Sequence, residues 1–333
     1  MGRSIRAGLA AVWLGLLLSV PALAAEPEAL VPVGRTVGLE LETDGIYVVR
    51  FEGEDGSSPA EAAGLRVGDR ILAANGRALG RAEELREQAA RSAGEPVVLD
   101  VERNRRAMQF AVRPVERDGS WRLGIRVRDR IAGLGTVTFY DPDTGLFGAL
   151  GHGVGGGDCP LAIRGGSAAE AEVTEVRRGE AGTPGSLFGR ALGGEALGRV
   201  ERNTDRGLFG HAEGEALAGR PVPLADPAEV TVGPAEILCG VTGSEVRRCA
   251  VEIEAVRFDP EHCRDLRLKV TDPRLLEQTG GIVQGMSGSP ILQNGKLVGA
   301  VTHVLVRDPT RGYGILIGHM LEAADENAEA EAA

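Results

Sequence analysis

Hydrophobic and polar positions change their pattern twice along this chain of 333 residues. An uninterrupted apolar run covers residues 7–20, directly after a short basic segment. Residues 31–114 then combine short alternating runs with two helical patterns, whereas residues 119–324 contain many short β-type runs separated by glycine-rich turns. The pattern predicts an export segment, a small α+β domain and a larger all-β domain that is a barrel or a sandwich.

The first segment has the features of a secretory signal peptide. Arg3 and Arg6 precede the apolar run, and residues 21–24 provide a small-residue A-x-A cleavage site. We expect residues 1–25 to be a signal peptide; an uncleaved signal that keeps the chain membrane-associated is the alternative. In both cases the folded chain is expected to be exported, to the periplasm or an intermembrane space.

The α+β domain is predicted from turn and cap residues. Strands at 37–41 and 45–51 flank an Asp44-Gly45 turn, and a short helix begins at Ser58-Pro59. A polar helix over residues 81–91 follows, and strands at 97–101 and 107–112 close the domain. In the all-β domain, a hairpin around residues 141–143 leads directly to His152.

Composition excludes some functions. The formal net charge is -11 and no basic stripe is present, so nucleic acid is not an expected partner. Part of the acidity lies in an Ala/Glu-rich end, and residues 325–333 are expected to be a disordered tail.

Four cysteines in an exported protein indicate one or two disulfides, and the sequence leaves three complete pairings open. A Cys239–Cys249 bond would close a hairpin. Zinc is the alternative, because His262 lies beside Cys263, but the chain has no C-x-x-C pair. We therefore expect no metal and no cofactor. The cysteines are Cys159, Cys239, Cys249 and Cys263.

The motif with the clearest chemistry is G-M-S-G-S-P, residues 285–290. Acyl transfer needs a serine hydroxyl on a rigid turn, with backbone N–H groups directed at the developing oxyanion. Ser287 is the expected nucleophile and Ser289 the alternative. The N–H groups of Gly285 and Ser287 are the expected oxyanion hole, in a loop like that of chymotrypsin-like proteases.

A serine nucleophile needs a base, and His152 is the preferred one, because glycines frame it at the end of a β-type run. His303 is the competitor; in the chymotrypsin-like arrangement Thr302 and His303 would instead form a wall of the substrate cleft. The carboxylate that orients the imidazole is expected to be Asp272, although Asp-Pro after a strand is also a common turn starter. Its rivals are Asp205 and Asp158.

Residues 58–76, S-P-A-E-A-A-G-L-R-V-G-D-R-I-L-A-A-N-G, resemble the PDZ family. PDZ domains bind a peptide as an added strand at a sheet edge. The resemblance implies a PDZ domain over residues 31–114, in which the loop of Arg35, Thr36, Val37 and Gly38 binds a terminal carboxylate beside the helix that begins at Arg81. A PDZ fold kept only as a brace between domains is the alternative.

Three further segments resemble the stage IV sporulation protein B (SpoIVB) serine peptidase family. They are T-F-Y-D-P-D-T-G-L-F-G-A-L-G-H-G, R-N-T-D-R-G-L-F-G and the long segment V-T-D-P-R-L-L-E-Q-T-G-G-I-V-Q-G-M-S-G-S-P-I-L-Q-N-G-K-L-V-G-A-V-T-H-V. In that family the G-H-G histidine, the T-D-P aspartate and the first serine of G-M-S-G-S-P are the functional residues. Those residues are His152, Asp272 and Ser287 here. An aspartate so close to the serine departs from the chymotrypsin-like order.

The expected fold is therefore mainly β: an N-terminal PDZ domain, then a chymotrypsin-like double β-barrel peptidase domain over residues 119–324. The resemblance implies a regulatory serine endopeptidase that cleaves specific proteins, with possible self-cleavage and membrane-tethered regulators among its partners. The alternative is an exported PDZ scaffold that binds peptides without cleaving them.

Overall fold

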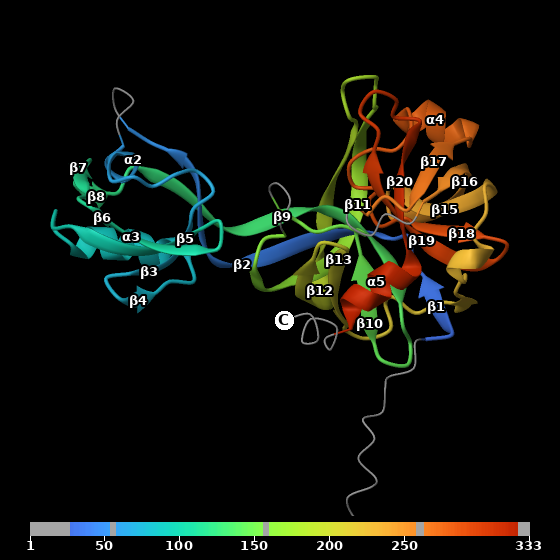
Figure 1. Ribbon diagram of the computed structural model, residues 1–333, viewed down its shortest axis with the longest axis horizontal. Helices are drawn as coiled ribbons and strands as arrows, with labels where there is room; N and C mark the ends of the chain where they lie inside the picture. Colours follow the sequence, from blue (N-terminus) through green and yellow to red (C-terminus); the bar gives the residue numbers. More distant parts are fainter. Residues whose placement is uncertain (1–26, 54–57, 156–159, 258–262, 326–333) are drawn as a thin grey trace, which may run out of the picture.

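The structure is a computed structural model that describes residues 27–53, 58–155, 160–257 and 263–325 (Figure 1). The predicted signal peptide and residues 326–333 of the predicted tail lie outside the described residues. The molecule is built mainly of antiparallel strands, as predicted, and it has two parts: a double barrel and a smaller unit beside it. In the part of the chain that is described, no helix is long and apolar enough to cross a bilayer.

Six strands form the first barrel. The ladder runs β9–β10–β13–β12–β11–β2, and β2 pairs again with β9, which closes the circle. Large apolar side chains such as Leu41, Phe147 and Leu208 fill its interior. The strands are β2 (Thr36–Phe51), β9 (Ile125–Tyr140), β10 (Leu146–Ala149), β11 (Ile163–Arg177), β12 (Ser186–Thr204) and β13 (Gly207–Ala212).

The second barrel closes in the order β15–β16–β17–β20–β19–β18 around a core that includes Ile237, Ile253 and Leu268. The prediction of a double β-barrel is therefore confirmed. The strands are β15 (Gly233–Thr242), β16 (Glu245–Val256), β17 (Leu266–Val270), β18 (Pro290–Gln293), β19 (Lys296–Val304) and β20 (Arg311–Leu316). Smaller elements around the barrels are β1 (Ala29–Pro32), β14 (Val222–Pro223), the 3-10 turn η2 (Pro227–Glu229), α4 (Pro273–Thr279) and α5 (Ile317–Ala324).

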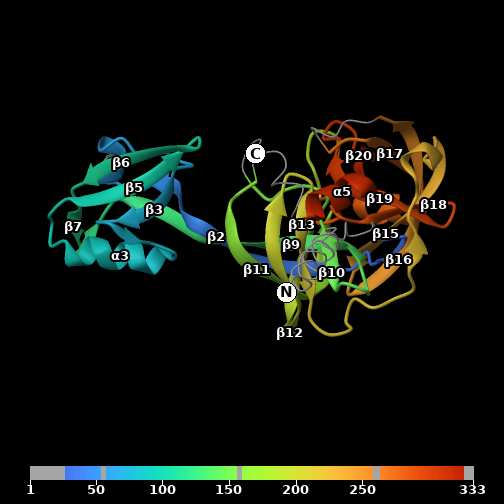
Figure 2. The same ribbon diagram turned by 60° about the horizontal axis from the view of Figure 1, so that its bottom comes forward.

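The smaller unit is an insertion in the first barrel. It comprises the chain between the two long strands β2 and β9, together with the ends of those strands, and it has its own core around Ile46, Ile71 and Leu99. Both views show β2 and β9 running out of the barrel into this unit (Figures 1 and 2). Its elements are α2 (Pro59–Ala62), β3 (Arg70–Ala74), β4 (Arg77–Ala78), α3 (Ala82–Arg91), β5 (Val97–Arg103), β6 (Arg106–Val112), β7 (Val115–Arg117) and β8 (Ser120–Arg122).

The predicted turn at Asp44-Gly45 is wrong, because β2 passes through it as one strand. The register against β9 jumps from Glu42–Arg130 to Tyr47–Arg128, so the extra residues form a bulge, and Gly45 takes the positive φ of 94° that this needs. The first half of β2 pairs inside the barrel and the second half pairs with β3 and β9. The barrel therefore includes chain before residue 45, which the predicted boundaries 31–114 and 119–324 do not provide for.

Candidate active site

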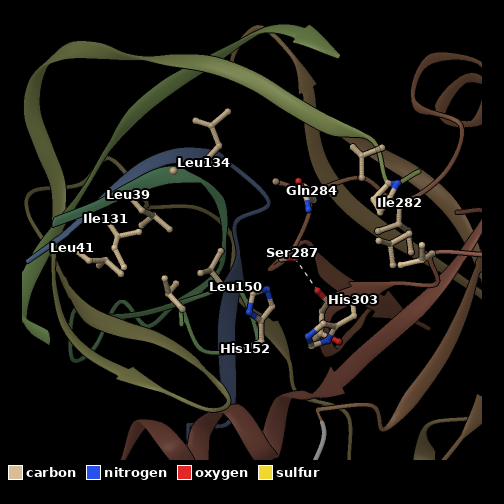
Figure 3. Close-up of a pocket in the computed structure, with 18 residues that line it drawn as sticks. Leu39, Leu41, Ile131, Leu134, Leu150, His152, Ile282, Gln284, Ser287 and His303 are labelled. Atoms are coloured by element: carbon tan, nitrogen blue, oxygen red, sulfur yellow. Dashed lines mark hydrogen bonds between the residues drawn. The ribbon is translucent and has the colours of Figure 1, made fainter. Parts of the chain in front are cut away.

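A pocket of about 470 Å³ opens where the two barrels meet. His152 reaches it from the loop after β10, while Ser287, Thr302 and His303 reach it from the second barrel (Figure 3). The remaining wall is mostly aliphatic. It comprises Leu39, Leu41, Ile131, Leu134, Leu150, Val154, Ile282, Val283, Val304 and Val306.

The serine loop is fixed by glycines and by β9. Gly285 and Gly288 have φ values of 101° and 93°, and a Cβ on Gly288 would lie 2.1 Å from the carbonyl oxygen of Thr136. Thr136 binds the loop twice: its N–H donates to the Ser287 carbonyl at 3.1 Å and its hydroxyl donates to the Gly285 carbonyl at 2.8 Å. Glycine is required here because the loop packs directly on the backbone of the first barrel.

The Ser287 hydroxyl faces the pocket and donates to the carbonyl oxygen of Thr302 at 2.8 Å (Figure 3). In the described structure no hydrogen bond joins this hydroxyl to His152. Ser289 differs, since it is completely buried and its hydroxyl has no hydrogen-bond partner among the described residues. This placement favours Ser287 over Ser289 as a reactive serine.

Two donors for an oxyanion lie in the same loop. Among the described residues, neither the backbone N–H of Gly285 nor that of Ser287 donates a hydrogen bond, whereas the N–H groups of Gln284, Met286 and Gly288 all do. Two unpaired donors on a rigid turn beside a hydroxyl are what a tetrahedral oxyanion needs. These are the two N–H groups that the sequence analysis expects to form the oxyanion hole, and that role stays a prediction.

His152 has the protonation pattern of a general base. Its Nδ1 lies 2.9 Å from the carbonyl oxygen of Gly153, and because a carbonyl can only accept, Nδ1 carries the hydrogen. Nε2 therefore keeps its lone pair. Burial lowers the pKa of His152 below its ordinary 6.5, so the imidazole is neutral at pH 7.

Asn203 holds the backbone that follows His152. Its side-chain carbonyl accepts from the N–H of Val154 at 2.9 Å, and its amide donates to the carbonyls of Val154 and Leu161. The sequence analysis did not single out Asn203 as a site residue. The sequence feature that could have indicated it is the R-N-T-D-R-G turn. In the folded chain this turn lies beside the loop of His152.

His303 is the neighbour of His152, with ring centroids 5.0 Å apart (Figure 3). Its Nδ1 is buried without a hydrogen-bond partner in the described structure. Burial, with smaller contributions from His152 and Arg264, lowers the pKa of His303 to about 4. Both imidazoles are therefore neutral near pH 7. His303 lines the pocket, and its role as a wall of the substrate cleft stays a prediction.

Asp272 does not reach this pocket. It is the N-cap of α4, where Oδ1 accepts from the N–H groups of Arg274 and Leu275 at 2.9 and 3.0 Å. These bonds lower the pKa of the Asp272 carboxyl. The structure thus places the predicted imidazole orienter on a helix end of the second barrel, and the contact that orients His152 is made by the Gly153 carbonyl instead.

The rivals of Asp272 supply no carboxylate either. Asp205 has an exposed side chain, and its backbone carbonyl accepts from the N–H of Gly153 at 3.1 Å. Asp158 lies outside the described residues. No described carboxylate forms a hydrogen bond with His152 or His303.

The predicted carboxylate loop of the small domain is wrong. Thr36, Val37 and Gly38 lie inside the first barrel, where Gly38 pairs with Leu134 on one side and Ala169 on the other. Arg35, directly before them, makes an ion pair with Glu170 of β11. A strand with partners on both edges cannot accept a further strand. The error follows from the insertion, because sequence order alone assigned these residues to the small domain.

A groove of about 520 Å³ lies elsewhere on the inserted unit, between α3 and the beginning of β9. Its apolar floor includes Leu85, Ala89, Leu123 and Val127. Arg86, Arg117, Arg122 and Arg126 also line it, against a single acidic residue, Glu52. In the described structure the N–H groups of Leu123 and Gly124 donate no hydrogen bond. This R-L-G-I segment is the place where an anionic chain end could bind, and the sequence analysis missed it.

Three of the four cysteines, Cys239, Cys249 and Cys263, lie in the described part of the chain. Cys239 and Cys249 are buried on the neighbouring strands β15 and β16, with their sulfurs 3.6 Å apart. Cys159 and His262 lie outside the described residues, so the zinc alternative involving His262 stays open. In the described part of the chain no group of three potential metal ligands occurs.

Comparison with known proteins gives two family matches. The family model of the SpoIVB peptidase S55 matches residues 119–321, and that of the PDZ domain matches residues 55–103. The PDZ domain of the SdrC-like protein from Listeria monocytogenes is 25% identical over 26% of this chain and 90% of that chain, with a TM-score of 0.23. The Rv3671c protease from M. tuberculosis, in its inactive form, is 16% identical over 58% and 84%, with a TM-score of 0.33. No curated protein matches.

Proposed function

Because the chain belongs to the SpoIVB peptidase S55 family and carries a PDZ domain, we propose that it is an endopeptidase in which Ser287 is the nucleophile and His152 the base. One observation carries this assignment: His152 with an unprotonated Nε2, the Ser287 hydroxyl and two unpaired backbone N–H groups line or adjoin a single pocket. The family match by itself makes the chain a serine peptidase; the residue roles are the proposal.

The reaction begins with a rotation of the Ser287 side chain from the Thr302 carbonyl toward His152. Nε2 takes the hydroxyl proton as Oγ attacks the substrate carbonyl carbon, and the oxyanion accepts from the N–H groups of Gly285 and Ser287. The imidazolium then donates its proton to the leaving amine, and the acyl-enzyme forms. Water, deprotonated by His152, attacks the ester and releases the second product together with Ser287.

The wall of the pocket supports aliphatic side chains next to the scissile bond. Ile282, Val283 and Val304 from the second barrel face Leu39 and Ile131 from the first, and no Asp, Glu, Lys or Arg lines the pocket. A charged substrate side chain would lose its hydration here without a partner. Substrates with bulky aliphatic residues at the cleavage site therefore fit best.

The biological role rests on the signal segment and the family. Residues 1–25 support export, so the substrates would be proteins or protein segments outside the cytoplasmic membrane, including membrane-tethered regulators. Cleavage of a few regulatory targets, self-cleavage and a part in sporulation belong to the same proposal. The PDZ domain would select the substrate or control its access to Ser287.

Fluorophosphonate labelling tests the catalytic assignment. Such a probe phosphonylates an activated serine, so the wild-type protein and the Ser289→Ala variant should be labelled, and Ser287→Ala and His152→Ala should not. Circular dichroism spectra of all four proteins check that each is folded. Labelling of Ser287→Ala at the wild-type rate would refute the assignment.

A further inference from the structure

One strand, β9, borders both the PDZ groove and the catalytic pocket. Its first residues, Ile125 to Val127, line the groove beside α3, while Ile131, Gly133 and Leu134 line the pocket. Two residues further on, Thr136 donates to the carbonyl oxygen of Ser287. The two sites are thus connected by a single stretch of extended backbone.

The edge of β9 that faces away from β2 carries no described strand between these sites; within this stretch the Asp129 carboxylate accepts a hydrogen bond from the N–H of Ala82, at the start of α3, at 2.8 Å. β10 pairs with β9 only at Val137, Phe139 and Tyr140, and no described strand pairs with that edge from Ile125 to Leu134. An unpaired edge of this length is a template for an added strand. Three exposed arginines lie on this part of β9; Arg126 and Arg130 pair with glutamates of the neighbouring segment of the chain, and Arg128 forms no ion pair among the described residues.

Hydrogen bonds at the two ends show which backbone groups face outward. Near the pocket, Val137 donates to Arg35, directly before β2, while the N–H of Thr136 points away. By the alternation of an antiparallel ladder, Leu134, Ala132 and Arg130 also point away. In the PDZ domain, Glu52 donates to Gly124, which turns Ile125 and Val127 outward. The residues whose N–H groups face outward are therefore odd-numbered up to Asp129 and even-numbered from Arg130 onward. This change lies opposite the bulge in β2.

We propose that the substrate is an extended protein C-terminus that pairs with this whole edge, with its terminal carboxylate at Leu123-Gly124 and its scissile bond at Ser287. This inference rests on the proposed function, because it uses the same nucleophile. The added strand runs antiparallel to β9, so the substrate's C-terminal end lies in the PDZ groove and the chain proceeds toward the pocket. The added strand needs one bulge opposite Asp129 and otherwise pairs one residue to one residue, which places cleavage about ten residues before the substrate's C-terminus.

The charges of the groove favour this occupant over an internal peptide loop. Four arginines and two unpaired N–H groups surround the position of the chain end. Three of the arginines form ion pairs, with Glu83, Asp118 and Glu52, and Arg117 forms none among the described residues. An apolar last side chain would rest on Leu85 and Ala89. An internal loop would bring no terminal carboxylate to the N–H groups of Leu123 and Gly124.

Binding can be measured without catalysis, in the Ser287→Ala protein. The probes are fluorescein-labelled peptides that alternate valine and glutamate and end in valine, with a free or an amidated C-terminus. Lengthening the free peptide from about four to about twelve residues should tighten binding about tenfold or more, since several backbone hydrogen bonds are added. Amidation should weaken every length about tenfold, because it removes the terminal charge.

A matched pair of variants tests whether the gain in affinity with peptide length comes from pairing with β9. Ala132→Pro removes an outward N–H without touching the β2 ladder, and Ala132→Val keeps that N–H. The gain with length should persist in Ala132→Val and disappear in Ala132→Pro, while the short peptide binds both equally. Absence of any gain with length, or its survival in Ala132→Pro, would overturn the proposal.

The active protein gives a second readout. Mass spectrometry of long peptides cut by the wild-type protein should show cleavage sites concentrated about ten residues from a free C-terminus, and amidated peptides should lose that concentration. Sites distributed without regard to the C-terminus would contradict the inference. A failure of the catalytic assignment would appear separately, as fluorophosphonate labelling that does not depend on Ser287.

Discussion

At the scale of single residues, the base is prepared by a backbone carbonyl rather than by a carboxylate. The Gly153 oxygen holds the hydrogen on Nδ1 of His152 and leaves Nε2 able to accept a proton. A carbonyl fixes the tautomer but stabilises the imidazolium less than a full negative charge would. The histidine therefore works from a neutral state that its apolar surroundings favour.

The pH dependence of labelling should reflect this environment. Burial lowers the pKa of His152, so the fraction of neutral base stays high as the pH falls below 6.5 and declines only at the lowered pKa. The rate of Ser287 modification by a fluorophosphonate, measured from pH 4 upward, should thus have its acid midpoint below about 6.5. A midpoint above that value would contradict the proposed environment. The acid stability of the fold is checked in parallel by fluorescence.

Asp272 should act through the helix that it caps. Replacing an N-cap aspartate by alanine costs about 1 kcal/mol of stability, while asparagine caps as well as aspartate. We expect Asp272→Ala to lower the free energy of unfolding in urea by about that amount and to reduce activity, because α4 leads into the Ser287 loop. Asp272→Asn should restore both. If Asp272→Asn were stable but inactive, the charge itself would be needed for catalysis.

At the scale of elements, the nucleophile turn of the second barrel depends on close contact with the first. Gly288 combines a positive φ with a Cβ position 2.1 Å from Thr136 O and 2.5 Å from Leu150 N. Gly295, in the tight turn between β18 and β19, has a similar φ of 78° but open space around it. Comparing substitutions at Gly288 and Gly295 therefore separates the cost of backbone strain from the cost of a steric clash.

Alanine at these two positions should therefore have different effects. Gly295→Ala should cost about 1 kcal/mol from strain alone. Gly288→Ala should cost more than about 3 kcal/mol or displace the loop, with loss of Ser287 labelling. Urea unfolding and labelling measure both effects. Equal costs would mean that the contact with β9 is less close than described.

The hairpin of β15 and β16 carries a pair of thiols suited to oxidation. Cys239 pairs with Arg247 and Cys249 with Ile237, so the two cysteines are diagonal neighbours. If the chain is exported, an oxidising compartment should join them into a disulfide. Alkylation without reduction, followed by mass spectrometry, should recover them as one cross-linked pair, and the bond should add about 2 kcal/mol relative to the Cys239→Ser, Cys249→Ser variant. Recovery of both as free thiols from exported protein would contradict this.

At the scale of the whole molecule, the PDZ domain is inserted into the peptidase rather than placed before it. An internal deletion should therefore be tolerated, while a deletion from the N-terminus should not. Joining Glu42 to Arg130 through Asn-Gly closes a hairpin between residues that already face each other. Removing all residues before 119 takes away β1 and the barrel half of β2.

The first deletion should give a folded protein that reacts with a fluorophosphonate, and the second an insoluble or unfolded one. Analytical gel filtration and circular dichroism distinguish them. A folded, active product of the N-terminal deletion would show that β2 is dispensable for the barrel, against its ladders with both β9 and β11.

The sequence predicted the parts that depend on local chemistry. Glycines around Ser287 and His152 marked both loops. The short strands indicated an all-β barrel or sandwich, and the resemblance to chymotrypsin-like peptidases implied the double barrel. The predictions failed where tertiary pairing decides: the hydrophobic alternation of residues 37–41 and 45–51 is the same whether Asp44-Gly45 is a turn or a bulge. The Asp272 signal was ambiguous for a related reason, since Asp-Pro suits a helix cap as well as an imidazole partner. The groove at Leu123-Gly124 could be found only once β9 was known to lie beside α3.

The connection between the domains is a two-stranded ribbon, with few other described contacts beyond those of Arg164 and Ala162 with residues of the inserted unit and its bulge. Such a ribbon bends easily across its flat face but resists stretching and bending within its plane. We therefore expect the PDZ domain to rotate about a single hinge axis across the ribbon. This rotation changes its angle to the peptidase domain, while the length of backbone between the two sites stays constant.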